Sequence, residues 1–155
     1  MKEVVELLTK NKETISTMES CTGGYIANAI TNIEGASEIL KFSAITYSNE
    51  YKIKMGVNKE TIDKYSVYSI NVANEMSKVI SEYTNSDYGI GITGKLNRVD
   101  IHNPYGEDNL VYVSIYTKKD NKYHNATITC TKESRALNKE LVLETIILIL
   151  KEIIK

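Results

Sequence analysis

The chain has 155 residues, of which 42% are hydrophobic and 25% charged, proportions typical of a single globular domain and unlike those of a disordered chain. Its formal net charge of −1 excludes the strongly basic surface that duplex DNA or an anionic membrane attracts, so we expect neither as a direct partner. The N-terminus lacks the apolar core of a signal peptide and no apolar run is long enough to span a bilayer, which predicts a cytoplasmic protein.

The first part of the chain predicts a helix, a strand and a second helix. Apolar residues recur at helical spacing over residues 3–10, residues 14–18 (TISTM) favour a short strand, and residues 25–33 return to a helical pattern. A glycine-bearing turn, residues 19–24 (ESCTGG), joins this strand to the helix that follows. Strand, tight turn and helix in this order are typical of an α/β unit, whose turn lies at the carboxyl edge of a sheet.

The middle of the chain continues this alternation. Residues 41–48 predict a strand and residues 49–65 a helical segment interrupted near Gly56. Ser69 is a good N-cap for a helix over residues 70–83. Its expected buried stripe comprises Val72, Met76, Val79, Ile80 and Tyr83. Residues 87–93 (DYGIGIT) then predict a central strand.

The last part combines a long loop, a hairpin and a helix. A polar stretch over residues 94–109 is unusually long for a compact domain, and such loops are more often functional than idle. Residues 110–117 and 122–130 predict an antiparallel hairpin. Residues 134–154 predict a long helix with Leu137, Leu141, Leu143, Ile147, Leu150 and Ile154 facing inward. We therefore expect one α/β domain over residues 1–155, with a mixed sheet covered by helices on both faces.

The turn at residues 19–24 is the densest candidate site. Ser20 could be a nucleophile, because the glycines let backbone N–H groups at a helix N-terminus face an oxyanion or a phosphate. Taken alone, Ser20 and Thr22 could equally be ordinary helix caps. Cys21 is the competing nucleophile, but neither His102 nor His124 lies in a segment that obviously returns to it, and the widely spaced Cys and His residues predict no metal site.

A second group of polar residues follows the strand at 41–48. Tyr47, Ser48 and Asn49 would end that strand at the same sheet edge as Ser20, and Lys52 lies one helical turn further on. A lysine beside Glu50 is usually a solvated charge, but a buried lysine can act as a general base when its pKa falls. Ser and Lys together can perform acyl transfer without a histidine.

Two further candidates lie later in the chain. Thr93 and Gly94 end the central strand where the long loop begins, and Arg135 opens the last helix with Lys139 one turn on. These residues could simply end a strand and line an exposed helix face, or the two cations could clamp a substrate phosphate.

Taken in chain order, seven short motifs of this sequence resemble the C-terminal domain of the CinA (competence/damage-inducible) family of nicotinamide-nucleotide amidohydrolases, also called PncC. The resemblance covers nearly the whole chain, and its specific motifs are those at residues 19–24 and 47–52. The motifs are residues 19–24 (ESCTGG), 35–37 (GAS), 47–52 (YSNEYK), 55–57 (MGV), 68–69 (YS) and 93–94 (TG), and Arg135 with a cation four residues later.

The resemblance implies a three-layer α/β/α sandwich that hydrolyses the carboxamide of nicotinamide mononucleotide without metal or cofactor. Ser20 would be the nucleophile, Lys52 its proton acceptor, and Tyr47 the group that orients or relays between them. Backbone N–H groups of Thr22, Gly23 and Gly24 would form the oxyanion hole. The nucleotide pocket would be lined by Asn49, Thr93, Gly94, Arg135 and, as the second cation, Lys139.

The chain departs from the family at the long loop. Where the family continues Thr-Gly with a glycine-rich run, this chain has residues 95–100 (KLNRVD), so Lys95 or Arg98 would have to contact a ligand in another way. The alternatives are therefore a nucleotide-binding or regulatory module with little or no turnover, or an amidase that reads a different acidic group. Relatives commonly self-associate, and strand 110–117 is the candidate to pair across a homodimer.

Overall fold

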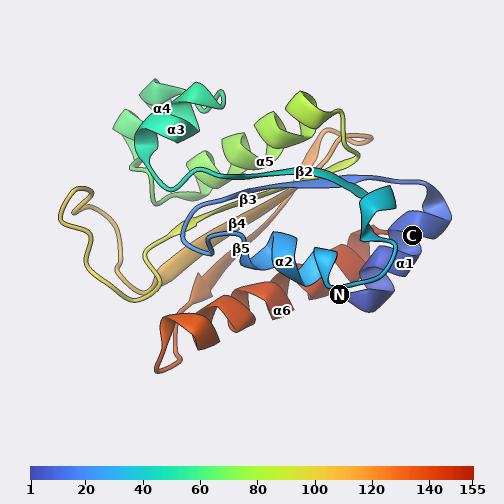
Figure 1. The fold of residues 1–155 in the computed structure, drawn as a ribbon. Helices are drawn as coiled ribbons and strands as arrows, with labels where there is room; N and C mark the ends of the chain where they lie inside the picture. The colour runs from blue at the N-terminus through green and yellow to red at the C-terminus, as the bar shows by residue number, and fades with distance from the viewer.

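The structure, a computed structural model, describes all 155 residues and forms three layers around one five-stranded sheet (Figure 1). The helices are α1 (Lys2–Asn11), α2 (Tyr25–Thr31), α3 (Asn49–Lys54), α4 (Lys59–Tyr65), α5 (Ile70–Thr84) and α6 (Arg135–Ile153), with a 3₁₀ turn at Ala36–Glu38. The strands are β1 (Ile15–Glu19), β2 (Leu40–Ile45), β3 (Tyr88–Gly94), β4 (Leu110–Thr117) and β5 (Lys122–Thr129).

The sheet has the order β2-β1-β3-β4-β5. Strands β2, β1 and β3 run parallel, while β4 and β5 add an antiparallel hairpin on one side. The carboxyl ends of β1, β2 and β3 therefore meet at one edge, where parallel α/β sheets place their ligands. The predicted mixed sheet and α/β/α sandwich are confirmed.

Helices cover both faces of the sheet. Helices α1, α2 and α6 pack on one face, and α3, α4 and α5 lie on the other (Figure 1). The larger apolar core joins the first group of helices to the sheet through residues such as Leu8, Ile26 and Ile146. No helix has the length and hydropathy needed to cross a bilayer.

The predicted inward face of α6 is confirmed in part, since Leu150 and Ile154 are buried, and Leu141, Leu143 and Ile147 are half-buried against the core. The buried residues of the helix are Asn138, Val142, Ile146 and Leu150, whereas Leu137 is exposed. The helix carries apolar residues on most of its circumference, so hydrophobic periodicity alone does not identify the inward face. In α5, Tyr83 is likewise exposed rather than buried and stacks against Phe42 with ring centroids 5.6 Å apart.

The position of β4 contradicts the predicted pairing of strand 110–117 across a homodimer, while self-association itself stays a prediction. Strand β4 pairs with β3 along one side and with β5 along the other, so its backbone groups have no free edge to offer a second chain. The two edge strands of the sheet are β2 and β5.

Candidate functional site

Ser20 lies directly after β1, in the turn that opens α2. Its backbone N–H donates to the carbonyl oxygen of Ile92 on the neighbouring strand β3, at 3.1 Å, so the turn is anchored in the sheet. Gly23 and Gly24 follow with φ of 61° and 93°, a backbone conformation that favours glycine and lets the chain reverse sharply into the helix. Ser20 is 6% exposed and lines the cleft described below.

The carboxylate of Glu19 fixes this turn from inside the protein. Glu19 is completely buried and accepts hydrogen bonds from the backbone N–H groups of Gly24, Ile26 and Ala27, at 2.9–3.2 Å. It also accepts the hydroxyl of Thr22 at 2.6 Å. An ionised carboxylate at a helix N-terminus satisfies donors that the helix itself cannot, and its charge matches the helix dipole.

Lys52 meets Ser20 from the other side of the sheet edge. It belongs to α3, whose N-cap Ser48 accepts the backbone N–H of Tyr51. The ammonium nitrogen Nζ lies 3.0 Å from Ser20 Oγ and donates to the carbonyl oxygen of Thr46 at 2.7 Å. Lys52 is only 1% exposed, and this burial lowers its pKa from 10.5 to about 8.

The hydrogen bonds of the turn correct the predicted oxyanion hole. The N–H of Gly23 donates to the carbonyl oxygen of Ser20, and that of Gly24 to Glu19, so both glycine donors are already used. The N–H groups of Cys21 and Thr22 have no acceptor within the protein. Of the three backbone N–H groups predicted for the oxyanion hole, only that of Thr22 is free. The N–H of Cys21 is a second free donor, which the sequence did not predict.

Neither a relay role for Tyr47 nor a nucleophilic role for Cys21 fits the contacts in the structure. Tyr47 is 65% exposed, and its hydroxyl forms no hydrogen bond with Ser20 or Lys52, which contact each other directly without a relay. An orienting role for Tyr47 stays a prediction. Tyr47 does line the cleft. Burial raises the pKa of the Cys21 thiol to about 12, so this cysteine stays protonated and is a poor nucleophile.

A cleft of about 710 Å³ opens over Ser20 and Lys52. Its walls are the turn after β1, the start of α3, Val67 and Tyr68 before α5, the loop after β3, and the start of α6. A cavity of this size suits a nucleotide-sized molecule. His, Cys, Asp and Glu side chains nowhere gather in threes around a point that could hold a metal ion.

Three of the five predicted substrate-binding residues line this cleft: Asn49, Gly94 and Arg135. Thr93 does not, because it is fully buried and its hydroxyl donates to the carbonyl oxygen of Val67 at 2.9 Å. Lys139 also lies outside the cleft wall, near Gly23. A Cβ atom at Gly94 would come within 2.7 Å of the Val111 Cα atom, so packing against β4 by itself requires a glycine here.

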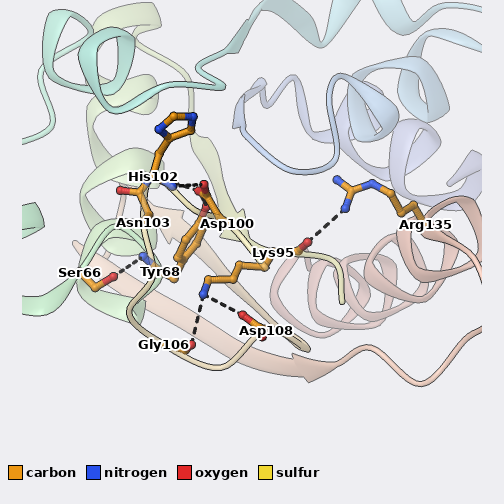
Figure 2. A network of polar contacts seen from close by, with 9 residues as sticks. All are labelled: Ser66, Tyr68, Lys95, Asp100, His102, Asn103, Gly106, Asp108 and Arg135. Carbon is orange, nitrogen blue, oxygen red and sulfur yellow. Dashed lines mark hydrogen bonds and ion pairs between the residues drawn. The ribbon is translucent and has the colours of Figure 1, made fainter. Parts of the chain in front are cut away.

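The base of the loop over residues 95–109 is held by Lys95 (Figure 2). Its ammonium group forms an ion pair with Asp108 at 2.9 Å and donates to the carbonyl oxygen of Gly106 at 3.3 Å. Arg135 in turn donates to the carbonyl oxygen of Lys95 at 3.2 Å. The charge of Lys95 is therefore used within the loop, which removes it as a reader of an acidic substrate group. Arg98 is exposed at the cleft wall without an ion pair.

The tip of the loop is tethered to the opposite wall. Asp100 accepts the hydroxyl of Tyr68, and the amide of Asn49 donates to the Asn103 side-chain oxygen at 2.9 Å. These contacts carry the loop across the mouth of the cleft. The sequence predicted a functional loop here, but it offered no signal for the partners of the loop.

Glu19 is the main residue of the site that sequence reasoning missed. It belongs to the ESCTGG motif, but the motif alone predicted no catalytic or structural function for it. The available signal was an acidic residue at the end of a buried strand, directly before a glycine turn and a helix. A carboxylate in that position is placed to cap the helix from within.

Comparison with known proteins gives one consistent result. The profile of the CinA C-terminal domain matches residues 1–153. A CinA-like protein of Flavobacterium psychrophilum is 36% identical over 156 residues, which cover 97% of this chain and 35% of that protein. A CinA-like protein of Kosmotoga olearia is 42% identical over 114 residues, which cover 73% and 27%. The chain thus spans about a third of the length of these relatives.

Solved structures with the same fold support this result. The competence/damage inducible protein CihA from Agrobacterium tumefaciens aligns with a TM-score of 0.84 at 23% identity, covering 96% of this chain and 92% of that one. A CinA superfamily protein from Klebsiella pneumoniae aligns with a TM-score of 0.85 at 21% identity, covering 97% and 92%. At these identities the match establishes the fold.

Proposed function

Because the chain belongs to the CinA C-terminal domain family, we propose that its cleft hydrolyses the carboxamide of nicotinamide mononucleotide to the carboxylic acid and ammonia. Ser20 is the nucleophile in this proposal and Lys52 the general base. The observation that carries it is the 3.0 Å contact between Ser20 Oγ and a buried lysine whose pKa is lowered to about 8. A buried, partly neutral lysine beside a hydroxyl is the arrangement that serine–lysine acyl transfer requires.

The first step forms an acyl-enzyme. Neutral Lys52 accepts the Ser20 proton while Oγ attacks the carboxamide carbon, and the free N–H groups of Cys21 and Thr22 stabilise the negative oxygen that develops. Protonated Lys52 then gives its proton to the leaving nitrogen, which departs as ammonia.

The second step releases the acid. Lys52, neutral again, accepts a proton from a water molecule that attacks the ester carbonyl of the acyl-enzyme. The hydrogen bond to the Thr46 carbonyl oxygen keeps Nζ pointed at the reacting atoms in both steps. Return of the proton to Ser20 Oγ completes the cycle.

The cleft also offers cations for the phosphate. Arg98 and Arg135 are the only arginines of the chain, and both line the cleft that contains Ser20. Arg135 uses one guanidinium nitrogen on the Lys95 carbonyl oxygen, which leaves its other donors for a ligand. Guanidinium groups bind phosphate through paired hydrogen bonds, so these two side chains suit the phosphate end of a mononucleotide.

Ammonia release from nicotinamide mononucleotide tests the proposal. We expect Ser20→Ala to lose at least about 100-fold in rate, while Ser37→Ala, an exposed serine remote from the cleft, keeps the wild-type rate. The wild-type rate should rise about tenfold per pH unit below pH 8 and level off above it, because only neutral Lys52 accepts a proton.

Two outcomes would contradict the proposal. Equal rates for the wild type and Ser20→Ala would exclude the serine mechanism. Thermal stabilisation by the nucleotide without any ammonia would instead identify the chain as a nucleotide-binding module without turnover.

A further inference from the structure

Asp100 is a fixed carboxylate in the wall of the cleft. It accepts the Tyr68 hydroxyl, the backbone N–H of His102 at 2.9 Å and the side-chain amide of Asn103 at 3.0 Å. Figure 2 shows Tyr68, His102 and Asn103 gathered around it. Asp100 lines the same cleft as Ser20 and Lys52.

This carboxylate is ionised throughout the working pH range. The hydrogen bond from Tyr68 lowers the pKa of Asp100 to about 2. Its charge also acts on the catalytic end of the cleft, because Asp100 raises the pKa of Lys52 against the larger effect of burial. The charge of Asp100 therefore contributes to the electrostatic potential at Lys52, beside the nucleophile.

Asp100 nevertheless has no cationic partner. All three of its donors are neutral groups, and no lysine, arginine or histidine forms an ion pair with it. Of the cations in the loop, Lys95 pairs with Asp108, and Arg98 forms no ion pair. A carboxylate that lines a ligand cleft and lacks a counter-ion favours a ligand that brings a positive charge.

We propose that Asp100 is a specificity residue, whose carboxylate binds the cationic pyridinium ring of the substrate. The inference rests on the proposed function, since N-glycosylation makes the ring of nicotinamide mononucleotide a cation. In this arrangement the carboxamide lies at Ser20, the positive ring faces Asp100, and the phosphate faces the arginines. A ring that has lost its charge, as in the reduced dihydropyridine form, loses the Asp100 interaction and keeps the others.

The test compares the affinities of two nucleotides that differ in ring charge. We would measure binding of nicotinamide mononucleotide and of its reduced, neutral-ring form to the Ser20→Ala protein, in which turnover is blocked. Adding Asp100→Asn should weaken binding of the cationic form about tenfold and leave the neutral form within about twofold. Asparagine keeps one oxygen for the Tyr68 hydroxyl but turns its amide nitrogen toward the backbone N–H of His102, so the ratio of the two affinities, and not either affinity alone, reports the lost charge.

Asn103→Ala, also on the Ser20→Ala background, is the matched control. It removes the two side-chain hydrogen bonds of Asn103, to Asn49 and to Asp100, but leaves the carboxylate charged, so the ratio of the two affinities should match that of Ser20→Ala alone. An unchanged ratio in Asp100→Asn, even with both nucleotides bound more weakly, would reduce Asp100 to a tether of the loop and overturn the inference. No preference for the cationic form in the Ser20→Ala protein would overturn it as well. Failure of that protein to bind either nucleotide would instead refute the proposed function, and the inference with it.

Discussion

The turn after β1 and the loop over residues 95–109 face each other across one cleft, but they are held in different ways. Ser20 and Lys52 are almost completely buried, and their positions are fixed by the sheet and by Glu19. The loop is fixed by polar tethers at its base and tip, while Ile101 is 81% exposed. Burial holds groups rigidly and shifts their pKa values, whereas exposed hydrogen bonds contribute about 1 kcal/mol each. We therefore expect chemistry to depend on the turn and substrate choice on the loop.

Glu19→Gln should have the largest effect on stability, because Glu19 fixes the turn from inside the protein. The amide group brings N–H donors against the backbone N–H groups that Glu19 now accepts, and it removes the charge at the start of α2. We expect a loss of about 3 kcal/mol in the free energy of unfolding, measured by urea denaturation. Glu34→Gln, an exposed acid, should change it by less than about 0.5 kcal/mol. Similar losses in both variants would show that Glu19 is not a special cap.

Lys52→Met should stabilise the protein near neutral pH, an effect of intermediate size. The pKa of Lys52 is about 8 in the folded state and 10.5 unperturbed, so the unfolded chain binds more protons between these values. Wild-type stability should therefore increase as the pH rises from 8 to 10.5, and the folded state carries a penalty of roughly 3 kcal/mol below pH 8. Methionine removes this penalty but leaves the Thr46 carbonyl oxygen without its donor, for a net gain of about 1–2 kcal/mol at pH 7.

Urea denaturation at pH 7 and at pH 10 measures this difference between Lys52→Met and the wild type. The advantage of the variant should shrink at the higher pH, because the wild-type lysine is then largely neutral. A constant difference between the two proteins would mean that Lys52 is not a depressed base.

Asn103→Ala in the otherwise wild-type protein should have the smallest effect, because it changes only tethers of the loop. The variant loses the hydrogen bond to Asn49 and the one to Asp100, both only partly buried. We expect KM for nicotinamide mononucleotide to rise about threefold, with kcat and the free energy of unfolding nearly unchanged. Glu107→Ala, on the same loop but outside the cleft wall, should leave both kinetic constants unchanged. A fall in kcat in the Asn103 variant would contradict the proposed division between chemistry and recognition.

The sequence predicted much of the fold and the centre of the site. Strand and helix periodicity located nearly every element, and the paired motifs around Ser20 and Lys52 placed both residues at one sheet edge, where they meet at 3.0 Å. These predictions succeeded because each depends on local pattern and on the rule that parallel strands end together.

The remaining features depend on contacts between distant segments. Tyr68 and Asp100 lie 32 residues apart, and nothing in either residue predicts the other as its hydrogen-bond partner. The role of Thr93 was also misassigned, because strand alternation does not say which buried hydroxyl faces a ligand and which meets a carbonyl oxygen. The exposure of Leu137 and the burial of Asn138 and Val142 in α6 were missed for a similar reason, since only the neighbouring strands select the most buried side of such a helix.

The two ends of the chain lie side by side, on the far side of the molecule from the loop over residues 95–109 (Figure 1). The Asn11 side chain donates to the carbonyl oxygen of Lys155 at 2.8 Å, and Lys151 forms an ion pair with Glu3. A peptide joining the ends could therefore be short, and new termini could be opened in the β4–β5 turn without disturbing the cleft. The same geometry means that a tag, a surface linker or a fused domain attached at either end would leave the mouth of the cleft facing outward.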